Sequence, residues 1–217
     1  MKPGLLILIS GRGSNALAIL DAIEAGIVPA ELRAVVADRR TAGLERAAER
    51  GIDTALVPRS AFASRDGFEN ALAEVIAGYS PDLIALAGFM RVLSADFVER
   101  HRGRMINIHP SLLPKYRGLN SHARALAAGD TVHGASVHWV TAELDGGPVI
   151  ARAEVAIQPG DNAERLAARV LEQEHRLYPA VVALLLANAV SMGHEIDSTS
   201  KVLVLDRDLD DRGRRIG

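Results

Sequence analysis

Leu5-Leu6-Ile7-Leu8-Ile9-Ser10-Gly11-Arg12-Gly13-Ser14-Asn15 is the stretch that decides the fold. Its first five residues form a continuous apolar run, which is typical of a strand buried on both faces of a parallel sheet. The run leads into small and polar residues, and a helical pattern over 16–25 follows and ends at Gly26. A buried strand, a glycine turn and a helix in this order predict the first unit of a parallel α/β fold.

Strand and helix patterns continue to alternate after this unit. Apolar strand patterns lie at 32–37, 54–57, 82–87 and 104–109, with helical patterns at 41–50, 65–79 and 94–100 between them. Alternation at this spacing builds right-handed βαβ crossovers. We therefore predict an α/β fold with a doubly wound, mostly parallel sheet of the Rossmann-like kind.

The pattern changes after His109. A loop, a short helix, two strands and a long helix follow, at 110–120, 122–128, 134–140, 149–157 and 162–186. Polar and apolar residues alternate in the two strands, so we expect an antiparallel strand pair near the C-terminal half. We expect Pro179 to interrupt the long helix, because proline lacks the backbone N–H. A weak strand over 202–205 ends the pattern.

Length and composition exclude several classes of protein. The 217 residues suit one α/β domain, which we place over 1–190, followed by a C-terminal tail over 191–217. A net charge of -2 predicts no nucleic-acid surface, and the absence of cysteine excludes a thiol nucleophile and a disulfide framework. We find neither a signal-peptide pattern nor an apolar run of membrane-spanning length, so we expect a cytoplasmic protein that does not act at a membrane.

The glycine turn suits a bound anion. Gly11-x-Gly13-x-x-Ala16 matches the dinucleotide fingerprint in its alanine form, and Asp38 ends the next strand where an acid would hold a ribose. The same turn also describes a general phosphate cradle, with Ser14 at the helix N-cap and free backbone N–H groups. Arg39 and Arg40 favour a monophosphate over a dinucleotide, and a tight turn without any ligand is the third interpretation.

A second motif ends the strand over 104–109. The residue before a proline is extended, and side chains alternate along a strand, so Asn107 and His109 share one face. An amide can donate to a developing oxyanion, and an imidazole can carry a proton near neutral pH. We expect catalysis at this strand end, and a polar end that only faces solvent is the alternative.

Asp145 lies in the turn between the two C-terminal strands, directly before Gly146-Gly147-Pro148. A carboxylate close to His109 would favour the charged imidazole and raise the pKa of His109. Asn107 would then donate a hydrogen bond to the oxyanion, His109 would carry the proton, and Asp145 would set the pKa of His109. The alternative is that Asp145 is only a turn residue.

Metal binding is another possible use of the histidines. His133 and His138 are separated by an odd number of positions, so they would face opposite sides of one strand. We find no set of His, Asp and Glu with zinc spacing, and we predict no metal.

These motifs together resemble a known family. Residues 107–114, Asn-Ile-His-Pro-Ser-Leu-Leu-Pro, look like the signature of the folate-dependent formyltransferases. Segments 10–15, 87–91, 143–148 and 173–175 narrow the resemblance, which extends from Leu5 to Leu186 in the family's order. It implies an enzyme of purine biosynthesis that transfers the formyl group of 10-formyltetrahydrofolate to the amine of glycinamide ribonucleotide.

The resemblance also implies a role for each matched residue. Asn107, His109 and Asp145 match the catalytic trio. The ribonucleotide site is matched by Gly13, Ser14, Asn15 and Glu174. The folate site is matched by Arg65, Met90, Arg91, Val92, Leu93, Asn107, Thr141, Ala142, Glu143, Leu144 and Asp145. The phosphate-binding part would then cover 1–100, and the catalytic and folate-binding part 101–190.

The implied reaction is a direct attack of the amine on the formyl carbon. Asn107 and a protonated His109 would stabilise the charged oxygen, and His109 would carry protons with its pKa set by Asp145. 10-Formyltetrahydrofolate would be the co-substrate, without a metal, and the partners would be small-molecule substrates. The sequence leaves undecided whether the protein forms a homodimer.

Two positions depart from the family pattern. Asn120 stands where the family often has histidine, and Arg117 stands where it often has proline. These differences leave undecided how the 110–120 loop closes. A formyltetrahydrofolate hydrolase would usually carry an N-terminal regulatory domain, and a methionyl-tRNA formyltransferase would be longer and more basic. A non-catalytic nucleotide-binding module or a nicotinamide-dependent dehydrogenase would not explain Asn107, His109 and Asp145 together.

Overall fold

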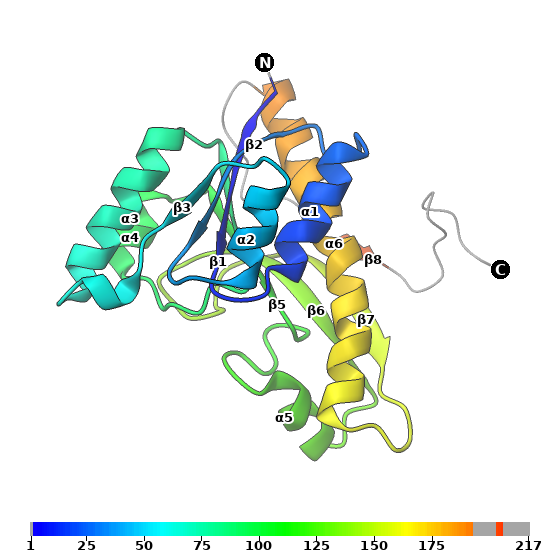
Figure 1. Ribbon diagram of the computed structural model, residues 1–217. Helices are drawn as coiled ribbons and strands as arrows, with labels where there is room; N and C mark the ends of the chain where they lie inside the picture. The colour runs from blue at the N-terminus through cyan, green and yellow to red at the C-terminus, as the bar shows by residue number, and fades with distance from the viewer. Residues whose placement is uncertain (1, 193–202, 206–217) are drawn as a thin grey trace.

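The computed structural model describes residues 2–192 and 203–205. The strands are β1 (Gly4–Ile9), β2 (Glu31–Ala37), β3 (Thr54–Leu56), β4 (Leu83–Leu86), β5 (Met105–His109), β6 (Val132–Trp139), β7 (Val149–Ala156) and β8 (Leu203–Leu205). The helices are α1 (Ser14–Glu24), α2 (Ala42–Glu49), α3 (Arg65–Tyr79), α4 (Ala95–Arg100), α5 (Ser121–Ala127) and α6 (Ala163–Met192), with a 3-10 turn η1 (Arg59–Ala61). These strands belong to one sheet, shown in Figure 1.

The order of the sheet is β3-β2-β1-β4-β5-β6-β7-β8. Pairing is parallel from β3 to β5, antiparallel for β5–β6 and β6–β7, and parallel again for β7–β8. The predicted doubly wound, mostly parallel sheet with an antiparallel pair is therefore confirmed. Because β1, β4 and β5 are parallel neighbours, the loops that follow them meet at one edge.

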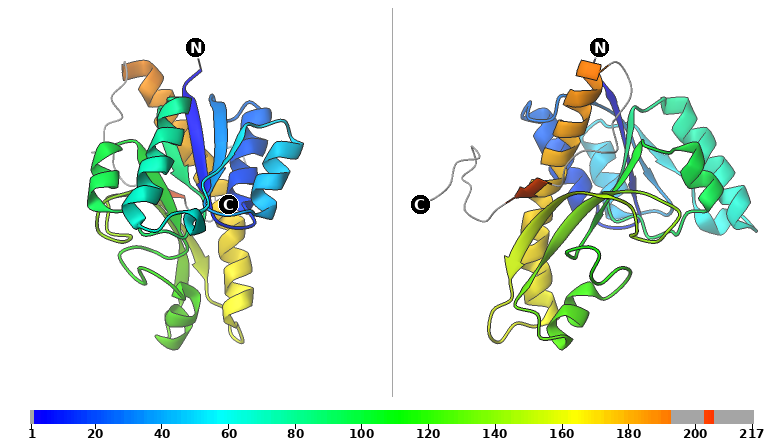
Figure 2. Two further views of the ribbon diagram at one scale, coloured as in Figure 1. Left: turned by 60° about the vertical axis from the view of Figure 1, so that its left-hand side comes forward. Right: turned by 180° about the vertical axis from the view of Figure 1, so that it is seen from behind.

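Helices cover both faces of the sheet, with α3 and α4 on one face and α1, α2 and α6 on the other (Figures 1 and 2). The apolar run of β1 serves both cores. Leu5, Ile7 and Ile9 join the core under α1 and α6, while Leu6 and Leu8 join the core under α3 and α4. Each side chain buried in this way contributes about 1.5–3 kcal/mol, which explains why the run has no polar position.

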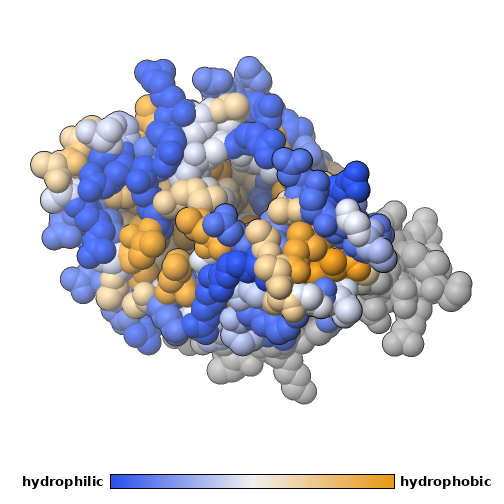
Figure 3. All heavy atoms as spheres, turned by 90° about the horizontal axis from the view of Figure 1, so that it is seen from below, coloured by the Kyte–Doolittle hydropathy of each residue, from blue (hydrophilic) through white to orange (hydrophobic). Residues whose placement is uncertain are grey.

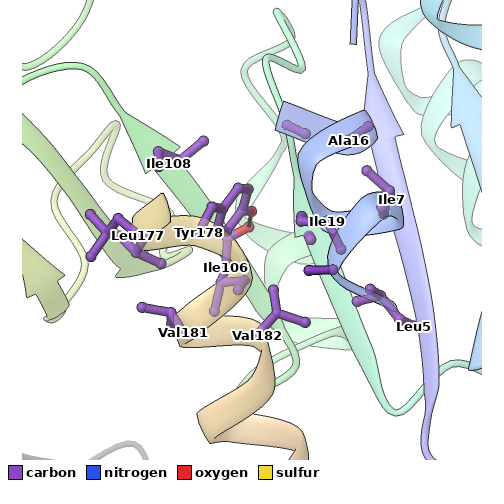
Figure 4. Close-up of a cluster of buried hydrophobic side chains, with 14 of the residues drawn as sticks. Leu5, Ile7, Ala16, Ile19, Ile106, Ile108, Leu177, Tyr178, Val181 and Val182 are labelled. Atoms are coloured by element: carbon purple, nitrogen blue, oxygen red, sulfur yellow. Dashed lines mark hydrogen bonds between the residues drawn. The ribbon is translucent and has the colours of Figure 1, made fainter. Parts of the chain in front are cut away.

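Helix α6 seals the middle of the sheet. Figure 4 shows Leu177, Tyr178, Val181 and Val182 of α6 facing Ile106 and Ile108 of β5. The buried Tyr178 hydroxyl lies 3.0 Å from the carbonyl oxygen of Leu86 and 3.2 Å from that of Ile106. One side chain thus links the end of β4 and the first part of β5 to the helix.

The predicted interruption at Pro179 is wrong, because α6 continues through this residue to Met192. Proline removes one backbone hydrogen bond from a helix, but packing of the apolar residues on both sides of Pro179 against the sheet holds the helix together. The weak strand expected over 202–205 corresponds to β8, and the rest of the predicted tail, 193–202 and 206–217, lies outside the described residues. Within the described part of the chain, every helix is too short or too polar to cross a bilayer.

Candidate active site

The end of β5 and the facing part of β6 bring an amide and an imidazole together. Asn107 pairs directly with His138 across the two strands, and its Nδ2 lies 3.1 Å from His138 Nε2. His138 Nδ1 lies 2.9 Å from the carbonyl oxygen of Trp139, and this oxygen can only accept a hydrogen bond. Nδ1 therefore donates to this oxygen, while Nε2 faces both the Asn107 amide and Asp145 Oδ1, which lies 3.6 Å away.

Asp145 reaches the same point from the connection between β6 and β7, where it has a left-handed φ of 48°. Its Oδ2 lies 3.3 Å from His109 Nδ1, and its Oδ1 lies 3.5 Å from Asn107 Nδ2. The N–H of Gly118 donates to Oδ2 over 2.9 Å. The structure thus brings Asn107, His109 and Asp145 together, and both the imidazole and the carboxylate are more than 90% buried.

Burial controls the charge of His109. It lowers the pKa of His109 below the ordinary value, although the Tyr116 carbonyl and the Asp145 carboxylate both act in the opposite direction. The expectation that Asp145 raises this pKa is right for the effect of Asp145 itself and wrong for the net result. Burial alone would raise the pKa of Asp145, but hydrogen bonds from His138 and Gly118 lower it. The resting pair is a neutral imidazole beside an ionised carboxylate.

A cleft of about 80 Å³ opens beside these groups. It is lined by Leu86, Phe89, Arg91, Val92, Leu93, Val98, Asn107, His138, Val140, Thr141, Ala142, Glu143, Leu144 and Asp145. Figure 3 looks onto this side of the molecule and shows apolar surface around a hollow. Most of the residues matched to folate line the cleft, but Arg65, in the first turn of α3, and Met90, which is exposed, do not.

The glycine turn leads from β1 into α1. Gly13, not Ser14, is the N-cap residue of α1, because it has a left-handed φ of 69° and Ser14 is the first helical residue. The prediction for Ser14 is therefore wrong by one position. A Cβ on Gly13 would lie 3.0 Å from Cα of Gly43, so α2 packs closely against this turn. Only glycine satisfies both the angle and the space.

Asn15 and Glu174 join the turn to α6. The Asn15 amide donates to Glu174 Oε2 over 2.6 Å, and both residues are buried. Burial raises the pKa of Glu174, which the hydrogen bond from Asn15 only partly offsets. Among the described residues, Asn15 Oδ1 is buried without a hydrogen-bond partner. The turn thus presents an unsatisfied acceptor beside a buried carboxyl group.

Comparison with known proteins decides the family. The model of the family "Formyl transferase" matches residues 4–182. The chain belongs to the formyl transferase family. It is 50% identical over 180 residues to phosphoribosylglycinamide formyltransferase of Escherichia coli, and the match covers 82% of this chain and 85% of that protein.

Solved structures agree with this assignment. Phosphoribosylglycinamide formyltransferase from Coxiella burnetii superimposes with a TM-score of 0.83 at 50% identity, over 87% of this chain and 89% of that one. Glycinamide ribonucleotide transformylase 1 from Symbiobacterium toebii superimposes with a TM-score of 0.84 at 40% identity, over 90% and 95% of the two chains. The family resemblance found in the sequence is confirmed.

In this formyltransferase the 110–120 loop lies against His109 and Asp145. The Tyr116 carbonyl oxygen lies 3.0 Å from His109 Nε2. Arg117, one of the unusual positions, forms an ion pair with Glu143, which lines the cleft. Asn120, the other, is the N-cap of α5 with a left-handed φ of 59°, which asparagine tolerates. The two substitutions are therefore accommodated at the loop.

Sequence reasoning missed His138 as a member of the formyltransferase site. It treats His138 only as a possible metal ligand, since the pairing of β6 with β5 cannot be read from the sequence. His133, on the same strand, instead contacts His122, with 3.2 Å between their ring nitrogens. Within residues 2–192 and 203–205, no three His, Asp or Glu side chains are grouped as metal ligands would be.

Proposed function

We propose that this formyltransferase transfers the formyl group of 10-formyltetrahydrofolate to the amine of glycinamide ribonucleotide, giving formylglycinamide ribonucleotide and tetrahydrofolate. The observation that carries the proposal is the convergence of Asn107, His109 and Asp145 beside the cleft, which Asn107 and Asp145 line. The names of the similar proteins support the choice of acceptor.

The glycine turn is the proposed ribonucleotide side. Gly13, Ser14 and Asn15 begin α1, where free backbone N–H groups and the helix dipole favour a phosphate. The buried Asn15 Oδ1 needs a donor, which a hydroxyl group of the ribose could supply. Glu174 lies next to it and would hold the same ligand, either as an acceptor or, because its pKa is raised by burial, as a donor.

The cleft is the proposed folate side. A flat, partly aromatic ligand needs apolar walls and a few polar groups that fix its orientation. Phe89, Val92 and Leu93 supply apolar walls on one side, and the segment 141–145 supplies the opposite side. Asn107 and Asp145 stand at the polar end, so the reactive part of the donor would lie there. Arg65 and Met90, outside the cleft, would contact only a longer tail of the ligand.

The geometry suggests the order of proton movements. The amine attacks the formyl carbon while the Asn107 amide donates to the oxygen, and losing one such donor typically costs about 3 kcal/mol. His109 is neutral at rest, and with its hydrogen on Nδ1 beside Asp145, its Nε2 takes the proton from the attacking nitrogen and then passes it to the departing nitrogen. Asp145 stabilises the imidazolium in between. Because Nε2 of His109 lies against the Tyr116 carbonyl, that contact must open first.

Other sequence predictions stay predictions. We infer that residues 1–190 act as one domain, with the phosphate site in 1–100 and the catalytic and folate sites in 101–190. The cytoplasmic location and a homodimer rest on the sequence alone.

The decisive experiment measures release of tetrahydrofolate from 10-formyltetrahydrofolate, with and without glycinamide ribonucleotide. Release that strictly needs the ribonucleotide supports the transferase. Release at the same rate without it identifies a hydrolase and contradicts the proposal. No release under either condition also contradicts it.

A binding titration separates the transferase from a nicotinamide-dependent enzyme. Trp139 is buried and directly precedes Val140 in the wall of the cleft, so its fluorescence should respond to a ligand there. We expect a change with tetrahydrofolate and none with NADH. The opposite result would favour a dinucleotide at the glycine turn.

A further inference from the structure

Asp38 is a buried carboxylate that the proposed reaction does not use. It directly follows β2, and its side chain is 0% exposed. In dinucleotide-binding folds an acid at this position holds a ribose from an open crevice. Here the carboxylate is enclosed by protein, and an enclosed charge persists only when partners compensate for lost water. The partners of Asp38 therefore indicate what it does.

Those partners come from both sides of the site. Arg91 Nε donates to Asp38 Oδ2, and the Arg39 guanidinium lies 3.1 Å from the same oxygen. The Ser10 hydroxyl also bonds to Asp38, and its oxygen accepts from the backbone N–H of Met90 over 2.8 Å. Ser10 begins the glycine turn, whereas Met90 and Arg91 belong to the segment that forms one wall of the cleft. Since β1 lies between β2 and β4 in the sheet, the carboxylate spans the end of β1.

The segment that Asp38 contacts is held by the buried side chains of Phe89 and Leu93 but by no regular secondary structure. Residues 89–94 between β4 and α4 form neither helix nor strand, so no hydrogen-bond ladder fixes them. Buried Glu69 of α3 accepts from the backbone N–H of Ser94 and anchors the far end. Arg91, one-third exposed, is the member of this segment that brings charge into the cleft. The contact with Asp38 uses Nε, which leaves the two terminal amino groups as donors for a ligand.

We propose that Asp38 is a positioning residue for the formyl donor: it holds the Arg91 guanidinium at the cleft and, together with Ser10, which accepts from the Met90 N–H, fixes this part of the cleft wall. This inference rests on the proposed function, because it takes the cleft as the donor site. Burial alone would raise the pKa of Asp38, but its hydrogen bonds to Arg39, Ser10 and Arg91 lower it, so the carboxylate stays charged.

The test is Asp38→Asn, which keeps the shape and removes the charge that aligns Arg91. We expect the KM for the formyl donor and the Kd for tetrahydrofolate to rise about tenfold, while kcat and the KM for glycinamide ribonucleotide stay near wild type. The matched control is Asp161→Asn. The carboxylate of Asp161 is also buried and forms an ion pair with an arginine, Arg169. This pair lies near the start of α6, and neither residue lines the cleft.

A purely structural role gives a different result. If Asp38→Asn and Asp161→Asn lower the melting temperature alike and leave the KM for the formyl donor unchanged, the proposal is overturned. An equal rise in both substrate KM values would also overturn it, because that indicates general damage to the site. If Asp38→Asn does not fold, Asp38→Glu supplies the same test, since it keeps the charge but displaces the carboxylate by one methylene.

Binding measurements keep this test apart from the test of the reaction. The Kd for tetrahydrofolate is read from Trp139 fluorescence and needs no turnover. If the wild type binds tetrahydrofolate and transfers no formyl group, the proposed function fails while Asp38 is still tested. If the wild type transfers the formyl group and Asp38→Asn binds tetrahydrofolate as tightly as the wild type, only the role of Asp38 is refuted.

Discussion

The parallel and antiparallel halves of the sheet build their parts of the site in different ways. In the parallel half, the turn after β1 offers backbone N–H groups, and Gly13 is required for its angle and its contact with Gly43. In the antiparallel half, β5 and β6 place Asn107 and His138 directly opposite each other. The turn after β1 depends on a residue without a side chain, Gly13. The β5–β6 pair depends on the chemistry of the Asn107 and His138 side chains. Substitutions in the two regions should therefore fail in different ways.

The largest effect is expected for Asp145→Asn in the antiparallel half. The amide cannot stabilise the imidazolium of His109, so kcat should fall by roughly 10²–10⁴-fold with little change in either KM. Steady-state kinetics with both substrates measures this, and Asp66→Asn on the exposed surface of α3 is the charge control. An unchanged kcat with a large rise in KM would remove Asp145 from the proton transfer.

Gly13→Ala tests the parallel half. A left-handed alanine costs about 1–2 kcal/mol, and the approach to Gly43 should add to this and weaken ribonucleotide binding. Gly26→Ala is the matched control, because Gly26 also has a positive φ of 74° but has open space around its Cβ position. Urea unfolding should show a larger loss for Gly13→Ala. Equal losses would mean that the contact with α2 is not limiting.

The pH dependence of stability tests His133 of β6. Burial lowers the pKa of His133 to about 4, below the ordinary value of 6.5. Between these values the unfolded chain binds a proton and the folded chain does not, so stability falls as the pH decreases. The loss between pH 7.5 and 5 should be about 2 kcal/mol from this residue. Urea unfolding of wild type and His133→Gln measures it, and equal slopes for the two proteins would contradict the assignment.

The smallest effect is expected for Arg117→Ala. The ion pair with Glu143 is exposed, so its loss should cost less than about 1 kcal/mol of stability. Arg102→Ala, which removes a similar exposed pair with Glu99, is the control. If the pair holds the loop over the cleft, only Arg117→Ala should make the KM for the formyl donor less sensitive to salt. Identical salt profiles would mean that the pair does not affect the cleft.

Local patterns were sufficient for much of the fold. The run Leu5–Ile9 predicted a strand buried on both faces, and alternation predicted that Ile106 and Ile108 would leave Asn107 and His109 on the other side. Facts that depend on long-range register or depth were not available. The sequence does not say which residue of β6 faces Asn107, so His138 was missed. It also does not say how deeply His109 is buried, so the predicted direction of the pKa shift of His109 was wrong.

Helix α6 has a mechanical consequence. It packs against α1 in the parallel half and against β6 and β7 in the antiparallel half. One continuous helix therefore contacts both halves of the molecule. A hinge motion between the halves would have to break α6 or the hydrogen bonds from the Tyr178 hydroxyl to β4 and β5. Substrates must therefore enter and products leave by movements of the surface loops, while the sheet and α6 keep their arrangement. Substitutions in these loops can change the rate of turnover without changing the sheet or α6.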